Sequence, residues 1–362
     1  MRGLIVEAGR PDSARYVDDL PEPDESEGQV LVQALAVGVC GTDREIVAAE
    51  YGTAPGPDNR LVIGHESLGR VISDDSGRWQ PGDLVAGIVR RPDPVPCVNC
   101  LVGEWDMCRN GQYVECGIKE RHGFARERWR VEPDFAVGLD ASLQEVGMLL
   151  EPTSVVAKAW EHIERIGLRA RYEPRTVLVT GAGPIGLLAA LLGRQRDLEV
   201  HVLDRSTDGP KPDLVAGLGA TYHTGQVCDL DFEPDLVLEC TGAPPVIAQV
   251  IDQVGPNGTV CLTGVSSGGR KLSLDLGGLN RDMVLENNVV FGSVNANLRH
   301  WQEAAHALGS ADPVWLSALI TRRVPAADYA TALENQPDDI KVVLDFAPDH
   351  QGKGRAPCHR HT

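Results

Sequence analysis

"TVLVTGAGPIGLL", residues 176–188, places three glycines in the spacing G-x-G-x-x-G. An apolar β-branched run precedes them and an apolar helical run follows. In this spacing the first glycine permits a tight turn, the second lets the backbone approach a pyrophosphate, and the third lets helix and strand pack closely. The stretch therefore predicts a doubly wound parallel sheet with a dinucleotide at the start of its first helix. The expected cofactor contacts here are Gly181, Gly183, Pro184, Ile185 and Gly186.

The next strand-like run, "EVHVLD", ends in Asp204. This is close to the roughly 20-residue spacing expected for the acid that binds the cofactor ribose. Asp204 would accept hydrogen bonds from both ribose hydroxyls and repel a 2′-phosphate, which favours NAD. Arg205 and Ser206 keep NADP open, because an arginine just past the strand can pair with that phosphate.

The sequence on either side of this motif shows two patterns. Up to about residue 150, short β-type runs alternate with Gly and Pro, which indicates an antiparallel, partly barrel-like domain. From about residue 155, strands and helices alternate, which indicates a parallel sheet. We expect an α/β protein with a mainly β catalytic domain over 1–155, completed by 296–350, and a dinucleotide-binding domain over 156–295. Residues 351–362 are expected to be a disordered tail.

Length, composition and charge limit the kinds of protein to which the chain can belong. A chain of 362 residues is too long for one ordinary core, and 42% apolar residues can fill two. No apolar run approaches the roughly 20 residues of a membrane span, and the N-terminus lacks the apolar stretch of a signal peptide, so a cytoplasmic location is expected. The net charge of −18 would repel phosphate backbones and anionic membranes, which excludes nucleic acid and membrane as expected partners.

Three separated segments carry metal-ligand side chains. They are "GVCGTD" with Cys40, "IGHESLG" with His65 and Glu66, and "LLEPTS" with Glu151. Cysteine, histidine and carboxylate are the zinc ligand types, and a catalytic site leaves one position for water or substrate. Each residue alone is more often a packed or surface residue. Their occurrence together, upstream of a dinucleotide motif, predicts a catalytic zinc site.

A longer set of strings resembles the zinc-dependent medium-chain dehydrogenases/reductases and, within them, the glucose 1-dehydrogenase branch. "GHE" and the glycine motif are typical of the whole superfamily, whereas three other features indicate the sugar branch. These are "CLVGEWDMC" (100–108), "EPTSVVAKAWEHI" (151–163) and "GSVN" (292–295). The resemblance covers nearly the whole chain except the tail. It implies a GroES-like catalytic domain beside a Rossmann domain, with the active site in the cleft.

The resemblance also implies roles for single residues. Cys40, His65 and Glu66 resemble the catalytic zinc ligands, with Glu151 as a fourth ligand or a close partner that touches substrate. Thr42 matches the hydroxyl residue that binds the reacting oxygen and passes on its proton. Further positions match cofactor or sugar contacts: Thr263, Gly264, Val265, Ser293 and Val294 for the cofactor, and Glu115 and Asn295 for sugar hydroxyls.

The cysteines at 97, 100 and 108 raise a separate question. The chain has nine cysteines, and an odd, scattered set favours metal binding over a disulfide framework. The family's structural zinc lobe has four cysteines, and Pro94 stands where the first would be. Either Asp93 replaces it as a carboxylate ligand for zinc beside Cys97, Cys100 and Cys108, or the lobe binds no metal. Cys116 is a further candidate, but it adjoins Glu115.

The implied activity is oxidation of an aldose, D-glucose first, at C1 to the lactone, with zinc assistance and hydride transfer to NAD(P). Hydrogen-bonding residues such as Glu115 and Asn295 suit a polyhydroxylated substrate. Two alternatives stay open: a polyol, threonine or simple-alcohol dehydrogenase of the same superfamily, and a non-catalytic dinucleotide-binding protein. A homo-oligomer, either dimer or tetramer, is expected.

Overall fold

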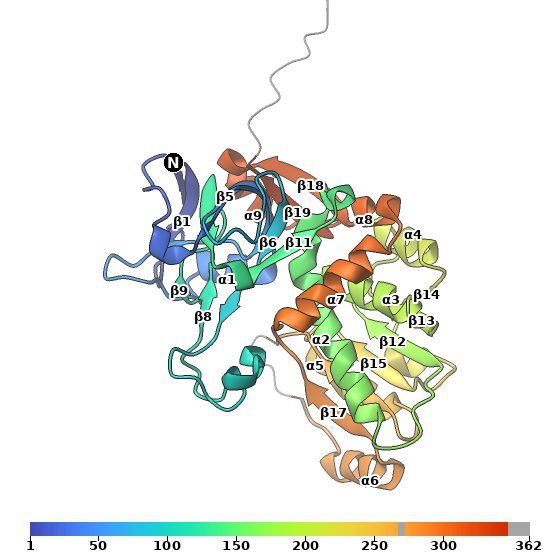
Figure 1. The fold of residues 1–362 in the computed structure, drawn as a ribbon. Helices are drawn as coiled ribbons and strands as arrows, with labels where there is room; N and C mark the ends of the chain where they lie inside the picture. Colours follow the sequence, from blue (N-terminus) through green and yellow to red (C-terminus); the bar gives the residue numbers. More distant parts are fainter. Residues whose placement is uncertain (267–271, 347–362) are drawn as a thin grey trace, which may run out of the picture.

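The computed structural model describes residues 1–266 and 272–346 and contains a parallel six-stranded sheet beside a mainly β body (Figure 1). The six strands lie in the order β14-β13-β12-β15-β16-β17, and every pair is parallel. This is the order of a doubly wound sheet, with the glycine turn after β12 at the point where the order reverses. The predicted α/β fold class is confirmed.

The elements of this part are short and regular. Its strands are β12 (Thr176–Thr180), β13 (Glu199–Leu203), β14 (Thr221–His223), β15 (Leu236–Glu239), β16 (Thr259–Leu262) and β17 (Val289–Gly292). Its helices are α3 (Pro184–Arg194), α4 (Pro210–Gly217), α5 (Pro244–Gln253) and α6 (Leu276–Glu286), with the short η7 (Val227–Asp229).

Close approach of α3 to β12 explains the third glycine of the motif. The helix begins at Pro184, and a Cβ on Gly186 would collide with the carbonyl oxygen of Gly181. Gly181 itself has φ +91°, a conformation that favours glycine. At Gly183 an added Cβ would meet no atom within 4 Å, so this position is open on the side where the cofactor is expected.

The β body is built around a seven-stranded sheet in the order β11-β6-β5-β3-β19-β18, with β10 also paired to β3. Its first strands come from the N-terminal part, and β18 and β19 come from the C-terminal part, where β19 lies antiparallel to β3. Two three-stranded sheets, β2-β1-β4 and β7-β8-β9, complete it. The predicted domain limits at 155 and 295 remain predictions.

The strands of the β body are β1 (Gly3–Glu7), β2 (Arg15–Val17), β3 (Val30–Val39), β4 (Arg60–Val62), β5 (Glu66–Asp74), β6 (Leu84–Gly87), β7 (Arg90–Arg91), β8 (Val114–Cys116), β9 (Glu120–Arg121), β10 (Arg128–Val131), β11 (Ala136–Leu139), β18 (Ile320–Pro325) and β19 (Lys341–Asp345). Its helices are α1 (Gly41–Val47), α8 (Pro313–Leu319) and α9 (Tyr329–Leu333). Short 3₁₀ turns are η1 (Glu25–Glu27), η2 (Cys100–Val102), η3 (Trp105–Met107), η4 (Pro133–Phe135), η5 (Ala141–Leu143), η6 (Gly147–Leu149) and η8 (Ala326–Asp328).

Two helices join the sheet and the β body. α2 (Leu150–Gly167) and α7 (Leu298–Gly309) pack against each other at the centre of the molecule (Figure 1). Trp160 of α2 and Trp301 of α7 are buried in the largest apolar core, which contains residues of both parts. α2 therefore reaches from the β body to the sheet as one rigid element.

None of the helices in residues 1–266 and 272–346 combines the length and apolar character that crossing a membrane requires. The expected tail, 351–362, lies outside the described residues.

The two glycines suggest a paired test of fold against binding. Gly186→Ala should lower the free energy of unfolding by about 1–3 kcal/mol, because the new methyl group overpacks the contact with Gly181. Gly183→Ala should keep the unfolding midpoint of the wild type and weaken cofactor binding instead. Thermal unfolding and a fluorescence titration with the dinucleotide measure the two effects. Equal midpoints for both variants would contradict this assignment of the glycines.

Candidate functional site

Cys40 and His65 meet where two strands of the β body end. Cys40 follows β3 and caps the start of α1, while His65 directly precedes β5, the neighbour of β3 in the sheet. The Sγ atom of Cys40 lies 3.1 Å from Nε2 of His65, and the backbone N–H of Thr42 donates to the same Sγ at 3.2 Å. Antiparallel pairing thus brings together two residues that are 25 positions apart in the sequence.

Asp43 is a third member of this group that the sequence analysis missed. Its Oδ1 lies 3.5 Å from Nδ1 of His65, an ion-pair distance, and its Oδ2 accepts the N–H of Cys40 at 2.9 Å. Burial opposes a charge on His65, but the adjacent Cys40 and Asp43 raise its pKa well above the ordinary value. The sequence signal was local: an acid in the first turn of the helix that Cys40 caps.

Two further carboxylates lie near His65. Ligand atoms of His65, Glu66 and Glu151 all lie within 4.8 Å of one another. Glu66 begins β5, whereas Glu151 is in the first turn of α2. Burial raises the pKa of Glu151 to about 7.

Lys341 compensates the buried charge of Glu66. Its Nζ lies 2.7 and 2.6 Å from the two carboxylate oxygens and also donates to the Val39 carbonyl at 3.3 Å. Both side chains are buried. Gly38, opposite Glu66 in the β3–β5 pairing, leaves room for the carboxylate, since a Cβ there would collide with it. Glu66 thus already has a strong partner, and its predicted role as a zinc ligand remains a prediction.

The donor set at this point fits a zinc ion. A thiol, an imidazole and carboxylates are the ligand types that zinc prefers, and they gather in two overlapping groups that share His65. Nδ1 of His65 and Oδ1 of Asp43 lack hydrogen-bond partners, and the 3.5 Å contact between them is too long to be one. The structure brings the four predicted ligands to one place; their coordination remains a prediction.

The residues expected to bind sugar also meet each other. Nδ2 of Asn295 donates to Oε1 of Glu115 at 2.7 Å, and Nε and Nη2 of Arg90 donate to the same oxygen at 3.0 and 2.9 Å. Glu115 lies in β8 and Asn295 follows β17, so this contact connects the β body with the sheet. Arg90 was not predicted; its guanidinium also lies over the Tyr113 ring, 3.7 Å from the centroid.

The expected cofactor residues 263–265 lie at the carboxyl end of the sheet. The backbone N–H groups of Thr263 and Gly264 donate to the Glu239 carbonyl, at 2.9 and 3.0 Å. Gly264 lies so close to Gly242 that a Cβ would collide with its amide nitrogen. Val265 is 79% exposed. This edge, next to the glycine turn, is where doubly wound sheets bind dinucleotides.

Asp204 has an unexpected basic partner. Its Oδ2 accepts the N–H of Ala182 at 2.7 Å and its Oδ1 that of Ser206 at 2.9 Å, while Nζ of Lys211 lies 3.2 Å from both oxygens. Arg205, Ser206 and Lys211 line a cavity of about 340 Å³, together with Asp208 and Asp338 among others. Lys211 balances the negative charge of Asp204 that favours NAD, and the cavity presents two cations beside two carboxylates.

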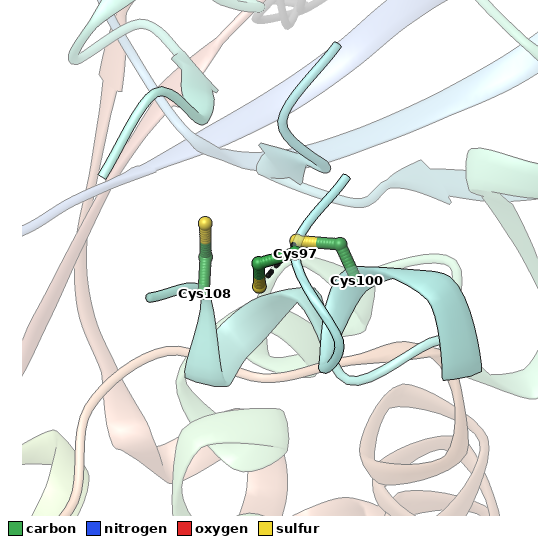
Figure 2. A group of neighbouring side chains, drawn as sticks. All are labelled: Cys97, Cys100 and Cys108. Atoms are coloured by element: carbon green, nitrogen blue, oxygen red, sulfur yellow. Dashed lines mark hydrogen bonds between the residues drawn. The ribbon is translucent and has the colours of Figure 1, made fainter. Parts of the chain in front are cut away.

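The three lobe cysteines form a third group (Figure 2). Sγ of Cys97 lies 3.7 Å from Sγ of Cys100, and the sulfur atoms of all three cysteines lie within 4.8 Å of one another. Backbone N–H donors, that of Arg109 first, lower the pKa of Cys97 to about 6, whereas burial raises that of Cys100 to about 11. Three such thiols fit zinc.

The fourth ligand of this lobe remains a prediction. Among the described residues, the thiol group does not include Asp93, whose buried Oδ2 lacks a hydrogen-bond partner. Cys116, the other candidate, is buried in β8, with its sulfur 4.0 Å from the Ile88 carbonyl.

Comparison with known proteins matches most of the chain. An alcohol dehydrogenase GroES-like domain matches residues 26–141, and a glucose dehydrogenase C-terminus matches residues 144–346. A glucose 1-dehydrogenase of Methanocella arvoryzae is 37% identical over 359 residues, covering 96% of this chain and 99% of its own. One of Thermoproteus tenax is 40% identical over 351 residues, covering 95% and 99%. The structure of Haloferax mediterranei glucose dehydrogenase with NADP, zinc and gluconolactone is 30% identical, with a TM-score of 0.89, covering 96% of this chain and 100% of that chain.

Metal content tests the two ligand groups separately. We expect about two zinc ions per chain in the wild type, one for each group. Cys40→Ala should lose one and keep the other, and Cys108→Ala should do the reverse. Elemental analysis of the purified, dialysed proteins provides the count. A wild type with a single zinc ion that Cys108→Ala retains would show that the cysteine lobe binds no metal.

Proposed function

Because the chain belongs to the glucose 1-dehydrogenase branch of the zinc-dependent medium-chain dehydrogenases/reductases, we propose that it oxidises an aldose, D-glucose first, at C1 to the lactone and transfers the hydride to NAD(P). The observation that carries this proposal is the site around His65, where a thiol and two carboxylates lie within reach of one imidazole. Relatives named glucose 1-dehydrogenase match over 95–96% of this chain.

The chain's own residues would hold the metal and move the proton. Zinc, when bound, supplies a Lewis acid that makes a substrate hydroxyl easier to deprotonate. Cys40, His65 and the two carboxylates would hold it, and the Asp43 carboxylate, at ion-pair distance from Nδ1 of His65, would favour the ring orientation in which Nε2 faces Cys40. Thr42, in the first turn of α1, would accept a hydrogen bond from the reacting hydroxyl and relay its proton, releasing its own hydroxyl proton toward solvent as it accepts the substrate's.

Glu115 and Asn295 would orient the sugar. The described contacts of the Glu115 carboxylate all involve Oε1, which leaves Oε2 for a substrate hydroxyl. Arg90 and Asn295 fix that carboxylate from two sides. Removing a matching hydroxyl from the substrate would leave these buried polar groups without a partner, so the pair should favour sugars over simple alcohols.

Either nicotinamide dinucleotide should bind. Asp204 favours the free ribose of NAD, and Arg205, Ser206 and Lys211 provide the charge and the cavity for a 2′-phosphate. The Haloferax mediterranei relative was solved with NADP.

A homo-oligomer is part of the same proposal. Within residues 1–266 and 272–346, β17 pairs only with β16 and forms one edge of the parallel sheet, so its other side could pair with a further strand. The neighbouring α6 exposes Leu276, Val284 and Leu285, each 66–70% exposed. A second copy of the chain that paired with this edge would cover both features.

The cytoplasmic location also remains a prediction.

Glucose-dependent reduction of the nicotinamide tests the proposed reaction. We expect it with D-glucose in the presence of either NAD or NADP, and we expect chelation to abolish it and zinc to restore it. Cys40→Ala and His65→Ala should reduce kcat to background. A zinc-loaded wild type that reduces neither cofactor with glucose, but does so with a polyol, threonine or simple alcohol, would assign the chain to a different branch of the superfamily.

Two variants test the cofactor assignment in opposite directions. Lys211→Ala should raise the KM for NADP about tenfold, because it removes a charge-assisted contact to the 2′-phosphate, and should leave the KM for NAD nearly unchanged. Asp204→Ala should shift preference toward NADP. Steady-state kinetics with saturating glucose measures both, and an unchanged KM for glucose is the control. A Lys211→Ala variant with unchanged KM for NADP would show that this cavity does not hold the phosphate.

A further inference from the structure

We propose that Lys158 and Asp106 position the segment 293–297, so that the cysteine lobe takes part in binding the nicotinamide and the sugar. The inference rests on the proposed function, which gives this segment its ligands. It departs from the expectation that the lobe is only structural.

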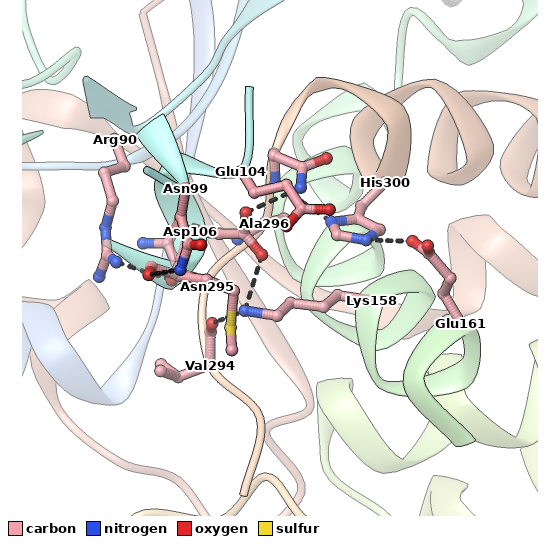
Figure 3. Close-up of polar contacts among 12 residues, drawn as sticks. Arg90, Asn99, Glu104, Asp106, Lys158, Glu161, Val294, Asn295, Ala296 and His300 are labelled. Atoms are coloured by element: carbon pink, nitrogen blue, oxygen red, sulfur yellow. Dashed lines mark hydrogen bonds and ion pairs between the residues drawn. The ribbon is translucent and has the colours of Figure 1, made fainter. Parts of the chain in front are cut away.

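Lys158 ties α2 to the segment. Its Nζ donates to the Val294 carbonyl at 2.9 Å and lies 2.8 Å from Oδ2 of Asp106 (Figure 3). The side chain is 1% exposed, so these acceptors replace the water that the ammonium group would otherwise bind. Because one of these acceptors is the Val294 carbonyl, the contact constrains the backbone of the segment and not only a side chain.

Asp106 ties the lobe to the same segment. It lies in η3, between Cys100 and Cys108, and its carboxylate is buried. Oδ1 accepts Nδ2 of Asn297 at 2.7 Å, while Oδ2 meets Lys158. The Asp106 carbonyl accepts Nη1 of Arg90 at 3.1 Å, and Arg90 also holds Glu115. One residue of the lobe thus contacts Arg90, which binds Glu115, and Asn297, which lies two residues after Asn295.

The segment is also anchored at its two ends, where the N–H of Ser293 donates to the Leu262 carbonyl at 2.9 Å and Asn297 caps α7. Val294 is 61% exposed, so its side chain contributes little packing. Asn295 has φ +64°, in the left-handed region that asparagine adopts more readily than most residues other than glycine. The contacts with Lys158, Glu115 and Asp106 fall on Val294, Asn295 and Asn297 in turn, and they add to the end anchors in fixing the conformation of the turn.

α2 relates this arrangement to the metal site. Lys158 and Glu151 are seven residues apart, about two turns and about 10 Å along one face of the helix. The same rigid element thus carries one predicted metal ligand and the cation that holds the segment. The helix sets the spacing between the metal and the segment that faces the nicotinamide.

Stability alone does not require these charges. A buried ion pair is often replaceable by apolar side chains of similar volume without loss of stability. Lys158 donates one hydrogen bond to the Val294 carbonyl. Fixing the geometry of the segment explains this contact better than stabilising the core does.

The test compares ligands that do and do not reach the segment. Lys158→Met/Asp106→Asn removes both charges and leaves neither unpaired. We expect about a tenfold higher Kd for the reduced dinucleotide and a higher KM for glucose, because the segment loses its anchors. The Kd for ADP-ribose or its 2′-phosphate, which lack the nicotinamide, should not change. Fluorescence titration, steady-state kinetics and thermal unfolding supply the readouts.

Arg126→Met is the matched control. Arg126 is a buried cation whose ion pair is with Glu27 in the β body. Its loss should lower the unfolding midpoint and leave the ratio of the two Kd values as in the wild type. If the double variant does not fold, Asp106→Asn alone, which keeps the side-chain volume, carries the same comparison.

Two results would separate the inference from the proposed function. Equal losses of affinity for both ligands, or a lower midpoint with an unchanged ratio, would overturn the positioning role. A changed ratio in a protein that shows no glucose turnover would support the positioning role and reject glucose as the substrate.

Discussion

A carboxylate buried away from water is stable as an anion only where a cation or several donors meet it, and the functional region of this protein is built on that constraint. Glu66 meets Lys341, Glu115 meets Arg90, and Asp106 meets Lys158. Each pair joins residues that are distant in the sequence. Because breaking such a pair leaves an uncompensated charge, the pairs fix the relative position of the strands and helices that carry them. The metal ligands and the expected sugar contacts take their places from this framework.

The helix α2 connects the parts of that framework. It begins at the predicted metal site with Glu151, passes Lys158, and ends packed against α3 beside the parallel sheet. Further along, Glu161 binds Arg299 and accepts a hydrogen bond from Nε2 of His300, whose Nδ1 accepts the N–H of Asn297. Val294 and Asn297 are thus both held by residues that contact or belong to α2. The predicted metal ligand Glu151 and the residue that binds the segment, Lys158, belong to the same helix. This helix therefore fixes the distance between the expected positions of the substrate and the nicotinamide.

Local patterns in the sequence predicted the sheet, the glycine turn and the candidate ligands, since each depends on a few adjacent residues. The lysines that pair with the buried carboxylates were not predicted, because their positions depend on contacts between residues that are far apart in the sequence. Lys341 and Lys158 look like solvated side chains in the sequence, and only the pairing of β19 with β3 and the packing of α2 bury them. Lys211 lies seven residues beyond Asp204, and the turn that brings them together has no sequence signal of its own. The absence of a ligand can be read from the sequence, as Pro94 shows for the cysteine lobe. Which residue binds in its place depends on the side chains that are neighbours in the folded protein.

The long separation between Glu66 and Lys341 also affects how the protein is made. They are 275 positions apart, and Lys341 lies in the last strand that the structure describes. During synthesis, the ribosome exposes Cys40, His65 and Glu66 long before Lys341 emerges, so the nascent N-terminal part cannot neutralise the buried acid. The metal site therefore reaches its final form only when β19 inserts beside β3. A polypeptide that lacks β19 leaves the Glu66 carboxylate without the cation that neutralises it in the folded protein.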